Sequence, residues 1–233
     1  MPFYFYGIDS YYILLVIPAI IISIFAQIKV KSTFSKYSKI TNGAGITGCE
    51  AARRVLDANN VSGVKIERVS GSLTDHFDPR TNVIRLSDTV YDSSSVAAVG
   101  VAAHEAGHAV QYAENYAPIK IRNSFVPVAN FGSSFSWILL IMGIAFSFEP
   151  LIFAGIICFA FVTLFHLLTL PVEFNASRRA IFAIRNSGIL QNENDIKGAK
   201  SVLSAAAMTY VSALIVSLAQ LLRLLLIANR RRR

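Results

Sequence analysis

Residues 126–170, VPVANFGSSFSWILLIMGIAFSFEPLIFAGIICFAFVTLFHLLTL, decide the fold class because they contain one charged side chain, Glu149. A helix needs about 20 mostly apolar residues to cross the hydrocarbon core of a membrane, so this stretch is long enough for two. The Glu149-Pro150 pair divides it with a turn signal. We therefore predict a transmembrane hairpin over 126–170, with one helix on each side of that turn.

Two more apolar segments flank this hairpin. Residues 11–28 carry no charge, and residues 202–228 are interrupted only late, by Gln220 and Arg223. A cleaved signal peptide is the alternative for 11–28, but it lacks a basic start and a small-x-small cleavage site. The chain has 233 residues and is only 15% charged, against about 25% in average soluble chains. The sequence predicts a mainly α-helical membrane protein with about four transmembrane helices.

Basic residues near the segment ends predict the orientation of the chain. Four lysines follow the first segment within 29–39, which places residues 29–125 in the cytoplasm. The hairpin returns residues 171–200 to the same side. A full fourth crossing would put Arg230–Arg233 outside, against the same rule, so the orientation of the last helix stays open. The net charge of +8 collects beside these segments, where anionic lipid lies, and we expect no nucleic-acid partner.

The polar region 29–125 predicts a small α+β domain. Asn42 is a candidate N-cap for a helix that ends at Asn59, and Ser93 or Ser94 for a long helix from about residue 95 to 114. The expected elements, in order, are a helix over 29–40, a helix to about residue 58, a strand over 64–69, a turn over 75–80, a strand over 83–86 and the long helix. Cys49 and Cys158 lie in different regions, so we expect no disulfide.

One glycine-rich segment resembles a nucleotide-binding fingerprint. Residues 43–48 read G-A-G-I-T-G, with Glu67 nineteen residues beyond the last glycine. That fingerprint requires a preceding strand within a parallel βαβ unit. Here a lysine-rich stretch precedes it, so we interpret it as a flexible turn before a helix and expect no nucleotide.

The segment His104-Glu105-Ala106-Gly107-His108 carries the chemistry. On a helix, residues four apart stack on one face, so His104 and His108 can share one tetrahedral Zn²⁺. Glu105 is rotated about 100° from His104, which brings it near a zinc-bound water as a general base. The alternative is a histidine pair making contacts inside a helix bundle. We predict a zinc site, with Glu105 catalytic.

A catalytic zinc takes three protein ligands and keeps one open position. Glu173 is our third ligand because two membrane crossings return it to the side of His108. Glu114 follows His108 on the same helix but on a different face, and Glu149 lies at the far end of the hairpin. We expect a polar helix to begin at Pro171. The alternative is that Glu173 only occupies the first turn of this helix, where the helix dipole stabilises its negative charge.

Three other residues remain open as ligands. His166 lies two turns before Glu173, and we interpret it as a buried polar contact rather than a ligand. Asp75 or His76 is the fallback third ligand. His76 is also our candidate donor to the tetrahedral oxyanion, while the alternative for residues 75–80 is a plain hairpin turn.

Three motifs in this order carry a resemblance that covers nearly the whole chain. They are T-D-H-F-D-P-R at 74–80, A-A-H-E-A-G-H-A at 102–109 and P-V-E-F-N-A-S-R-R-A at 171–180. The sequence resembles the YugP-type family of bacterial membrane neutral zinc metallopeptidases and, more distantly, the HtpX proteases and CaaX prenyl proteases. The resemblance implies a gluzincin-like site with His104, His108 and Glu173 as ligands and Glu105 as base. This sequence differs from the distant relatives at position 177, where they have Asp and it has Ser177. Asn175 is then our candidate for a residue that supports the ligands.

We therefore expect a membrane-bound zinc metalloprotease of a bacterial inner membrane, with its site facing the cytoplasm. Its expected partners are a protein or peptide substrate and the lipid bilayer, and the strand over 83–86 could offer its edge to the peptide. The alternative is a non-proteolytic membrane scaffold with a structural zinc site. A metal transporter is disfavoured, because few polar residues lie inside the spans. The substrate, the regulation and the oligomeric state stay open.

Overall fold

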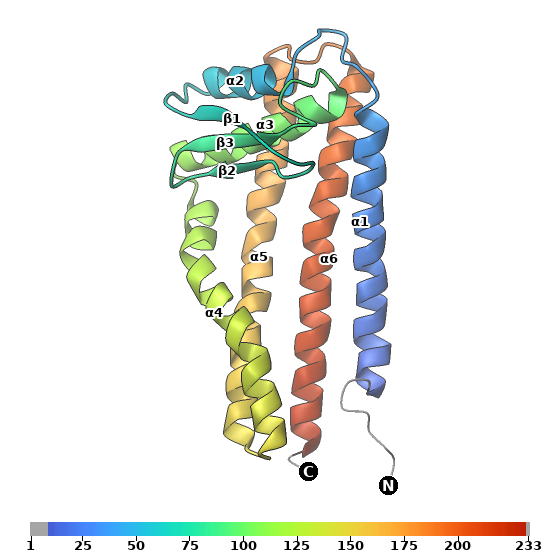
Figure 1. Cartoon of the computed structure of the whole chain (residues 1–233), viewed down its shortest axis with the longest axis vertical. Helices are drawn as coiled ribbons and strands as arrows, with labels where there is room; N and C mark the ends of the chain where they lie inside the picture. Colours follow the sequence, from blue (N-terminus) through green and yellow to red (C-terminus); the bar gives the residue numbers. More distant parts are fainter. Residues whose placement is uncertain (1–8, 232–233) are drawn as a thin grey trace. The chain divides into compact units, whose positions relative to one another are not determined.

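The computed structural model describes residues 9–231, so Arg232 and Arg233 of the basic tail lie outside the described range. Within this range helices dominate, and a single small sheet lies between them in sequence (Figure 1). The elements in order are a π-helical turn Tyr12–Val16, α1 (Ile17–Tyr37), α2 (Gly48–Ala58), β1 (Lys65–Val69), β2 (His76–Asp78), β3 (Val83–Ser87), α3 (Val96–Ala113), α4 (Ala117–Ala145), α5 (Glu149–Asn186) and α6 (Glu193–Arg231).

The chain divides into two compact units. Of the described residues, the apolar unit comprises 9–27, 121–170 and 209–231, and the mixed unit comprises 28–120 and 171–208. Four helices of the described residues are long and apolar enough to cross a membrane: Tyr12–Tyr37, Ala117–Ala145, Glu149–Asn186 and Glu193–Arg230. The fold is therefore the mainly helical one that the sequence predicts, with four candidate spans and a three-stranded sheet.

The helices extend well beyond the predicted apolar segments. α4 begins at Ala117 rather than near Val126, and α6 begins at Glu193 rather than near Val202. Hydropathy marks the apolar part of a helix, whereas its ends are set by caps and chain breakers. The prediction that a new helix begins at Pro171 is wrong, because Pro171 lies inside α5. Glu173 is therefore in the helix interior, and its alternative role as a helix N-terminal residue is excluded.

In the apolar unit, α4 and α5 approach closely through small residues. A Cβ added to Gly155 would lie 2.9 Å from the carbonyl oxygen of Ser136, and one on Gly132 would collide with the carbonyl oxygen of Cys158. Such small residues let helix backbones pack without a hydrophobic driving force between them. Many large apolar side chains point outward, among them Leu14 and Phe25 on the first helix. This pattern suits a solvent of lipid tails rather than water.

The mixed unit contains the sheet, whose strand order is β1-β3-β2. β1 pairs parallel with β3, and β2 pairs antiparallel with it, with Phe77 opposite Ile84. β3 is therefore the central strand and is buried on both faces, except at Arg85. The expectation that residues 83–86 offer a free edge is wrong, because both of its edges are paired. Residues 76–78, predicted as a turn, form the edge strand β2.

α2 and α3 pack against each other in the core of the mixed unit. Thr47 caps α2 in a capping box with Glu50, and Ser95 caps α3 through the amide of Ala98. These caps replace the predicted Asn42 and Ser93 or Ser94. The side of α2 that faces this core is fully enclosed, because four of its residues are at most 1% exposed: Ala51, Ala52, Val55 and Leu56.

Asn42 instead holds the glycine-rich loop that leads into α2. Its side-chain amide donates to the carbonyl oxygens of Ile46 and Ser94, and its Oδ1 accepts from the amide of Ile46. Gly45 adopts a φ of +66°, which favours glycine. Gly48 lies directly against the carbonyl of Val90, where a Cβ would collide. Local geometry therefore accounts for two of the three glycines of the G-x-G-x-x-G segment.

Candidate metal centre

α3 carries the two histidines, and its sequence explains why this helix is so enclosed. Between Val96 and Val110 most of its residues are small, and nearly all of them are fully buried in the mixed unit. Small side chains let neighbouring helices approach closely, and at Gly100 a Cβ would lie 3.3 Å from the Cβ of Ala199 on α6. His104 and His108 remain partly exposed on one face, with ring centroids 4.7 Å apart.

α5 brings Glu173 to these histidines. A Cβ on Gly107 would lie 2.9 Å from the carbonyl oxygen of Ala176, so the glycine inside the HEAGH segment permits the contact between α3 and α5. Glu173 is 4% exposed, and its Oε2 lies 3.3 Å from Nε2 of His104 and 3.6 Å from Nε2 of His108. The structure therefore brings together the three residues that the sequence proposed as metal ligands, with one donor atom from each within 4.8 Å of the others.

The second nitrogen of each imidazole faces away from Glu173 and has its own partner. Nδ1 of His104 lies 3.2 Å from Oγ of Ser177, and Nδ1 of His108 lies 3.0 Å from Oε1 of Gln111. Metal-binding histidines usually donate the other ring N–H to such a partner, which orients the ring and fixes its tautomer. Ser177, noted in the sequence as a departure, thus contacts the predicted ligand His104 directly.

Gln111 was missed by the sequence analysis. It lies three residues after His108, on the neighbouring part of the same helix face. That spacing was a readable signal, because a buried glutamine one turn from a ligand can reach its ring. Asn175, proposed as a supporting residue, acts through Gln111: its Oδ1 accepts from Nε2 of Gln111 at 2.9 Å and from Nε of Arg179 at 2.7 Å.

The electrostatics of His108 reflect its two acidic neighbours. Burial lowers the pKa of this imidazole, but the hydrogen bond and charge of Glu173 and the charge of Glu105 raise it, and the net pKa lies above the ordinary value. In the metal-free protein these carboxylates therefore favour a proton on His108. A metal cation satisfies the same negative potential, so a cation and a proton compete for this nitrogen.

Glu105 is only 9% exposed, next to His104 on α3. Within residues 9–231 no hydrogen bond or ion pair holds its carboxylate. Its charge nevertheless raises the pKa of His108, so its carboxylate lies close enough to act on that imidazole. A carboxylate that is close to a cation site and is not committed to another protein group can accept a proton from a molecule bound there.

The segment 74–80 holds the edge of the sheet. Asp75 accepts from the amide of Ser87 at 2.7 Å and from its hydroxyl at 3.0 Å, which ties β2 to β3. Asp78 accepts from the hydroxyl of Thr81 at 2.7 Å and the amide of Arg80 at 2.9 Å, and these bonds lower the pKa of Asp78 to about 2. Both carboxylates therefore have structural roles in the hairpin.

His76 is exposed on β2, with its Nδ1 2.8 Å from the carbonyl oxygen of Thr74. Within the described residues, the cluster of potential metal donors contains neither His76 nor Asp75, so the geometry does not favour the fallback ligands. Its role as an oxyanion donor stays a prediction.

The remaining candidates lie apart from this cluster. Glu114 is the C-cap of α3 and pairs with Arg179 at 2.7 Å, so its carboxylate is engaged away from the histidines. His166 and Glu149 belong to the part of α5 in the apolar unit. Neither joins the donor cluster found within the described residues.

The donor set fits a zinc ion. Two imidazole nitrogens and one carboxylate oxygen are the ligands of many catalytic zinc sites, which keep a fourth position open, whereas structural zinc sites usually have four protein ligands. The described residues offer three donors here. The outer partners of both imidazoles are also present, as zinc sites require.

Two comparisons with known proteins bear on the same residues. A family model described as "Putative neutral zinc metallopeptidase" matches residues 12–229. A protein of Bacillus subtilis (strain 168), named "Putative membrane protease YugP", is 48% identical over 216 residues, which cover 93% of this chain and 96% of that protein. No solved structure matches.

Proposed function

This chain belongs to the neutral zinc metallopeptidase family, and from that premise we propose that it is a membrane-bound zinc endopeptidase. The proposed ligands are His104, His108 and Glu173, and the proposed base is Glu105. The single observation that carries the proposal is the convergence of three donors beside a buried carboxylate that no side chain or backbone group of residues 9–231 holds. Three ligands rather than four favour catalysis over a structural role for the metal.

The chain's own residues supply the binding and the proton transfers. When bound, Zn²⁺ supplies Lewis acidity, which lowers the pKa of water and polarises the scissile carbonyl. Glu105 accepts the proton of the attacking water and passes it to the leaving amine nitrogen. Glu173 and the two histidines hold their donor atoms in place through the packing of α3 on α5. His76 is the proposed donor to the oxyanion.

The sheet edge supports a peptide as the substrate. Among the residues that the structure describes, β2 pairs only with β3, so its other edge can add an extended chain by backbone hydrogen bonds. Phe77 on β2 contacts Tyr112 of α3, with ring centroids 6.1 Å apart. Tyr112 follows His108 by one turn and is 42% exposed. This aromatic pair gives the proposed binding edge an apolar side chain near the metal ligands.

The proposed substrates are membrane or membrane-proximal proteins, cleaved on the cytoplasmic side. Residues 28–120 and 171–208 form one compact unit, so they lie on the same side of the membrane. This supports the proposal that the hairpin between them crosses the membrane twice. The four lysines within residues 29–39, three in the C-terminal part of α1 and one just after it, favour the cytoplasm for this unit. Lipid is the second proposed partner, because the four apolar helices need a bilayer around them.

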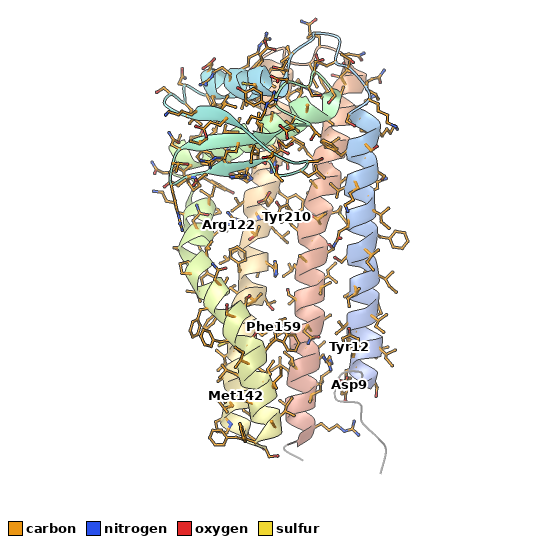
Figure 2. The ribbon with its side chains drawn as sticks, in the orientation of Figure 1. Asp9, Tyr12, Arg122, Met142, Phe159 and Tyr210 are labelled. Atoms are coloured by element: carbon orange, nitrogen blue, oxygen red, sulfur yellow. The ribbon has the colours of Figure 1, made fainter. Side chains whose placement is uncertain are left out.

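An ion pair in the apolar unit supports the proposal that α6, the fourth apolar helix, crosses the whole membrane. Oδ2 of Asp9 accepts from Nε of Arg223 at 2.8 Å and from its Nη2 at 2.6 Å. Asp9 precedes the first helix and lies beside its first turn, near Tyr12 (Figure 2). Arg223 belongs to the last third of α6, so the start of the first helix and the end of the last helix share one side. Reporter fusions after residues 40, 148, 190 and 233 would test this topology.

The test of function uses the full chain in detergent or liposomes with Zn²⁺. Wild-type protein should cleave a membrane protein or unfolded casein and stop when the metal is chelated. Glu105→Gln should reduce the rate by about 10²–10⁴-fold while its zinc content stays at the wild-type level. Zinc is measured by elemental analysis of the same samples.

The alternative, a scaffold with structural zinc, predicts a different outcome. Zinc-loaded wild-type protein would then cleave nothing, and removal of the metal would unfold the mixed unit. Equal cleavage by wild-type protein and Glu105→Gln would instead point to a contaminating protease and contradict the proposed base.

A further inference from the structure

Gln111 is completely buried, although its amide is polar. Burial of an amide without partners is costly, and here each polar atom of the side chain is used. Oε1 lies 3.0 Å from Nδ1 of His108, while Nε2 lies 2.8 Å from the carbonyl oxygen of Val172 and 2.9 Å from Oδ1 of Asn175. The amide therefore makes three contacts, one within α3 and two with α5.

The chemistry of these partners determines which way the amide points. The carbonyl oxygen of Val172 can only accept, and Oδ1 of Asn175 already accepts from Nε of Arg179. Both partners on α5 therefore need the two hydrogens of the amide nitrogen. A reversed amide would place an oxygen against two acceptors. Arg179 is in turn held by Glu114, at 2.7 Å from Nη1.

This orientation sets the tautomer of His108. Oε1 of Gln111 can only accept, so Nδ1 of His108 carries the hydrogen between them. A neutral imidazole has one N–H, and its other nitrogen then has a free lone pair. That nitrogen, Nε2, is the atom that faces Glu173 at 3.6 Å. The network thus prepares His108 to bind a cation through Nε2.

Gln111 also links two ligands that come from different helices. Its two partners on α5, Val172 and Asn175, lie immediately before and two residues after Glu173. One side chain therefore fixes the ring of His108 and the turn of α5 that carries the carboxylate ligand. Ser177 does less for His104, because a hydroxyl both donates and accepts and does not select a tautomer.

We propose that Gln111 is the positioning residue of the metal centre, and that it sets the tautomer of His108 and its alignment with Glu173. The inference rests on the proposed function, because it needs a metal at these ligands. Replacing an outer partner of a metal ligand typically costs about 10–100-fold in metal affinity. We expect a loss in that range when Gln111 is changed.

The test compares Gln111→Met with wild-type full-length protein in the same detergent. Methionine has a similar volume but neither donates nor accepts strongly. We expect zinc affinity, measured by competition with a chelator, to fall about 10–100-fold. The visible spectrum of the Co²⁺-substituted protein should also change, because the ligand geometry changes. Gln220→Met is the matched control, since Gln220 is 7% exposed on α6 in the apolar unit, and it should leave both readouts as in wild type.

A second variant keeps the test decisive if Gln111→Met does not fold. Asn175→Ala removes one acceptor of the amide and leaves Gln111 in place, so we expect a smaller loss of affinity in the same direction. Unchanged zinc affinity and an unchanged Co²⁺ spectrum in the folded variants would overturn the positioning role alone. Wild-type protein that binds neither ion would overturn both this inference and the proposed function.

Discussion

α5 packs against a different helix in each unit, and the two contacts serve different purposes. In the apolar unit it packs on α4 through Gly132, Gly155 and Ser136, where close backbone contact replaces the hydrophobic effect. In the mixed unit it packs on α3 through Gly107, and this contact brings Glu173 to the histidines. The same device, a glycine against a backbone carbonyl, packs a candidate membrane hairpin in one unit and assembles the candidate metal centre in the other.

The two units also differ in what they bury. The mixed unit contains one large core that joins α2, α3, β3 and the ends of α5 and α6. The buried cluster of the apolar unit is small, and its members are Leu140, Ile152, Ile156, Leu224 and Ala228. Water drives the first unit to fold, whereas lipid surrounds the second. A change in one unit should therefore leave the other largely intact, which the following predictions test.

The largest expected effect comes from Glu173→Gln. The change removes one anionic ligand but keeps the shape of the side chain. Zinc affinity should therefore fall more than about 100-fold, which exceeds the loss expected when a residue that only hydrogen-bonds to a ligand is replaced. Peptidase activity should disappear with the metal. Zinc titration of purified protein measures this, with Glu149→Gln in the apolar unit as the control. Wild-type zinc binding by Glu173→Gln would show that our third ligand is wrong.

Gly107→Ala should have the next largest effect. The new Cβ would meet the carbonyl oxygen of Ala176 at 2.9 Å, so α3 and α5 must separate. Overpacking of this kind costs about 1–3 kcal/mol. If this cost falls entirely on the metal-bound state, zinc affinity decreases by up to about 100-fold. Chelator competition measures the affinity. A variant that binds zinc as tightly as wild type would show that this contact does not position Glu173.

The pH dependence of zinc binding should follow His108. The pKa of His108 is raised above its ordinary value in the metal-free protein by the nearby carboxylates of Glu173 and Glu105, so on acidification it takes up a proton earlier than an ordinary histidine does. Zinc affinity should therefore fall as the pH is lowered, by about tenfold per unit for each proton released on binding. Titrations between pH 8 and pH 6 measure this. His166→Ala, in the apolar unit, should leave the profile unchanged, and a shifted profile would contradict the separation of the units.

Gly132→Ala should have the smallest effect on the metal centre. Its Cβ would collide with the carbonyl of Cys158, so the hairpin should lose about 1–3 kcal/mol of stability. Zinc affinity should stay within about twofold of wild type, because the ligands belong to the mixed unit. Thermal unfolding in detergent, followed with zinc titration, measures both. A parallel loss of zinc affinity would show that the two helix contacts are coupled.

The sequence predicted which three side chains come together better than it predicted the local geometry around them. His104 and His108 were readable because helical periodicity places residues four apart on one face. Glu173 required a topological argument, that two crossings return the chain to one side. The caps of α2 and α3 were misplaced, because several Ser, Thr and Asn residues compete at each start and only the backbone path selects one.

The sequence by itself determined the four apolar segments and the HEAGH helix, because both depend on patterns that are local along the chain. Only the tertiary structure decided which partners hold the imidazoles. Gln111, Ser177 and Asn175 are ordinary polar residues until α3 packs on α5. Likewise, Pro171 ends a helix in most local contexts, but the structure continues α5 through it and carries Glu173 to His104 and His108. Contacts between residues more than 60 positions apart leave no local pattern, so these roles depend on packing alone.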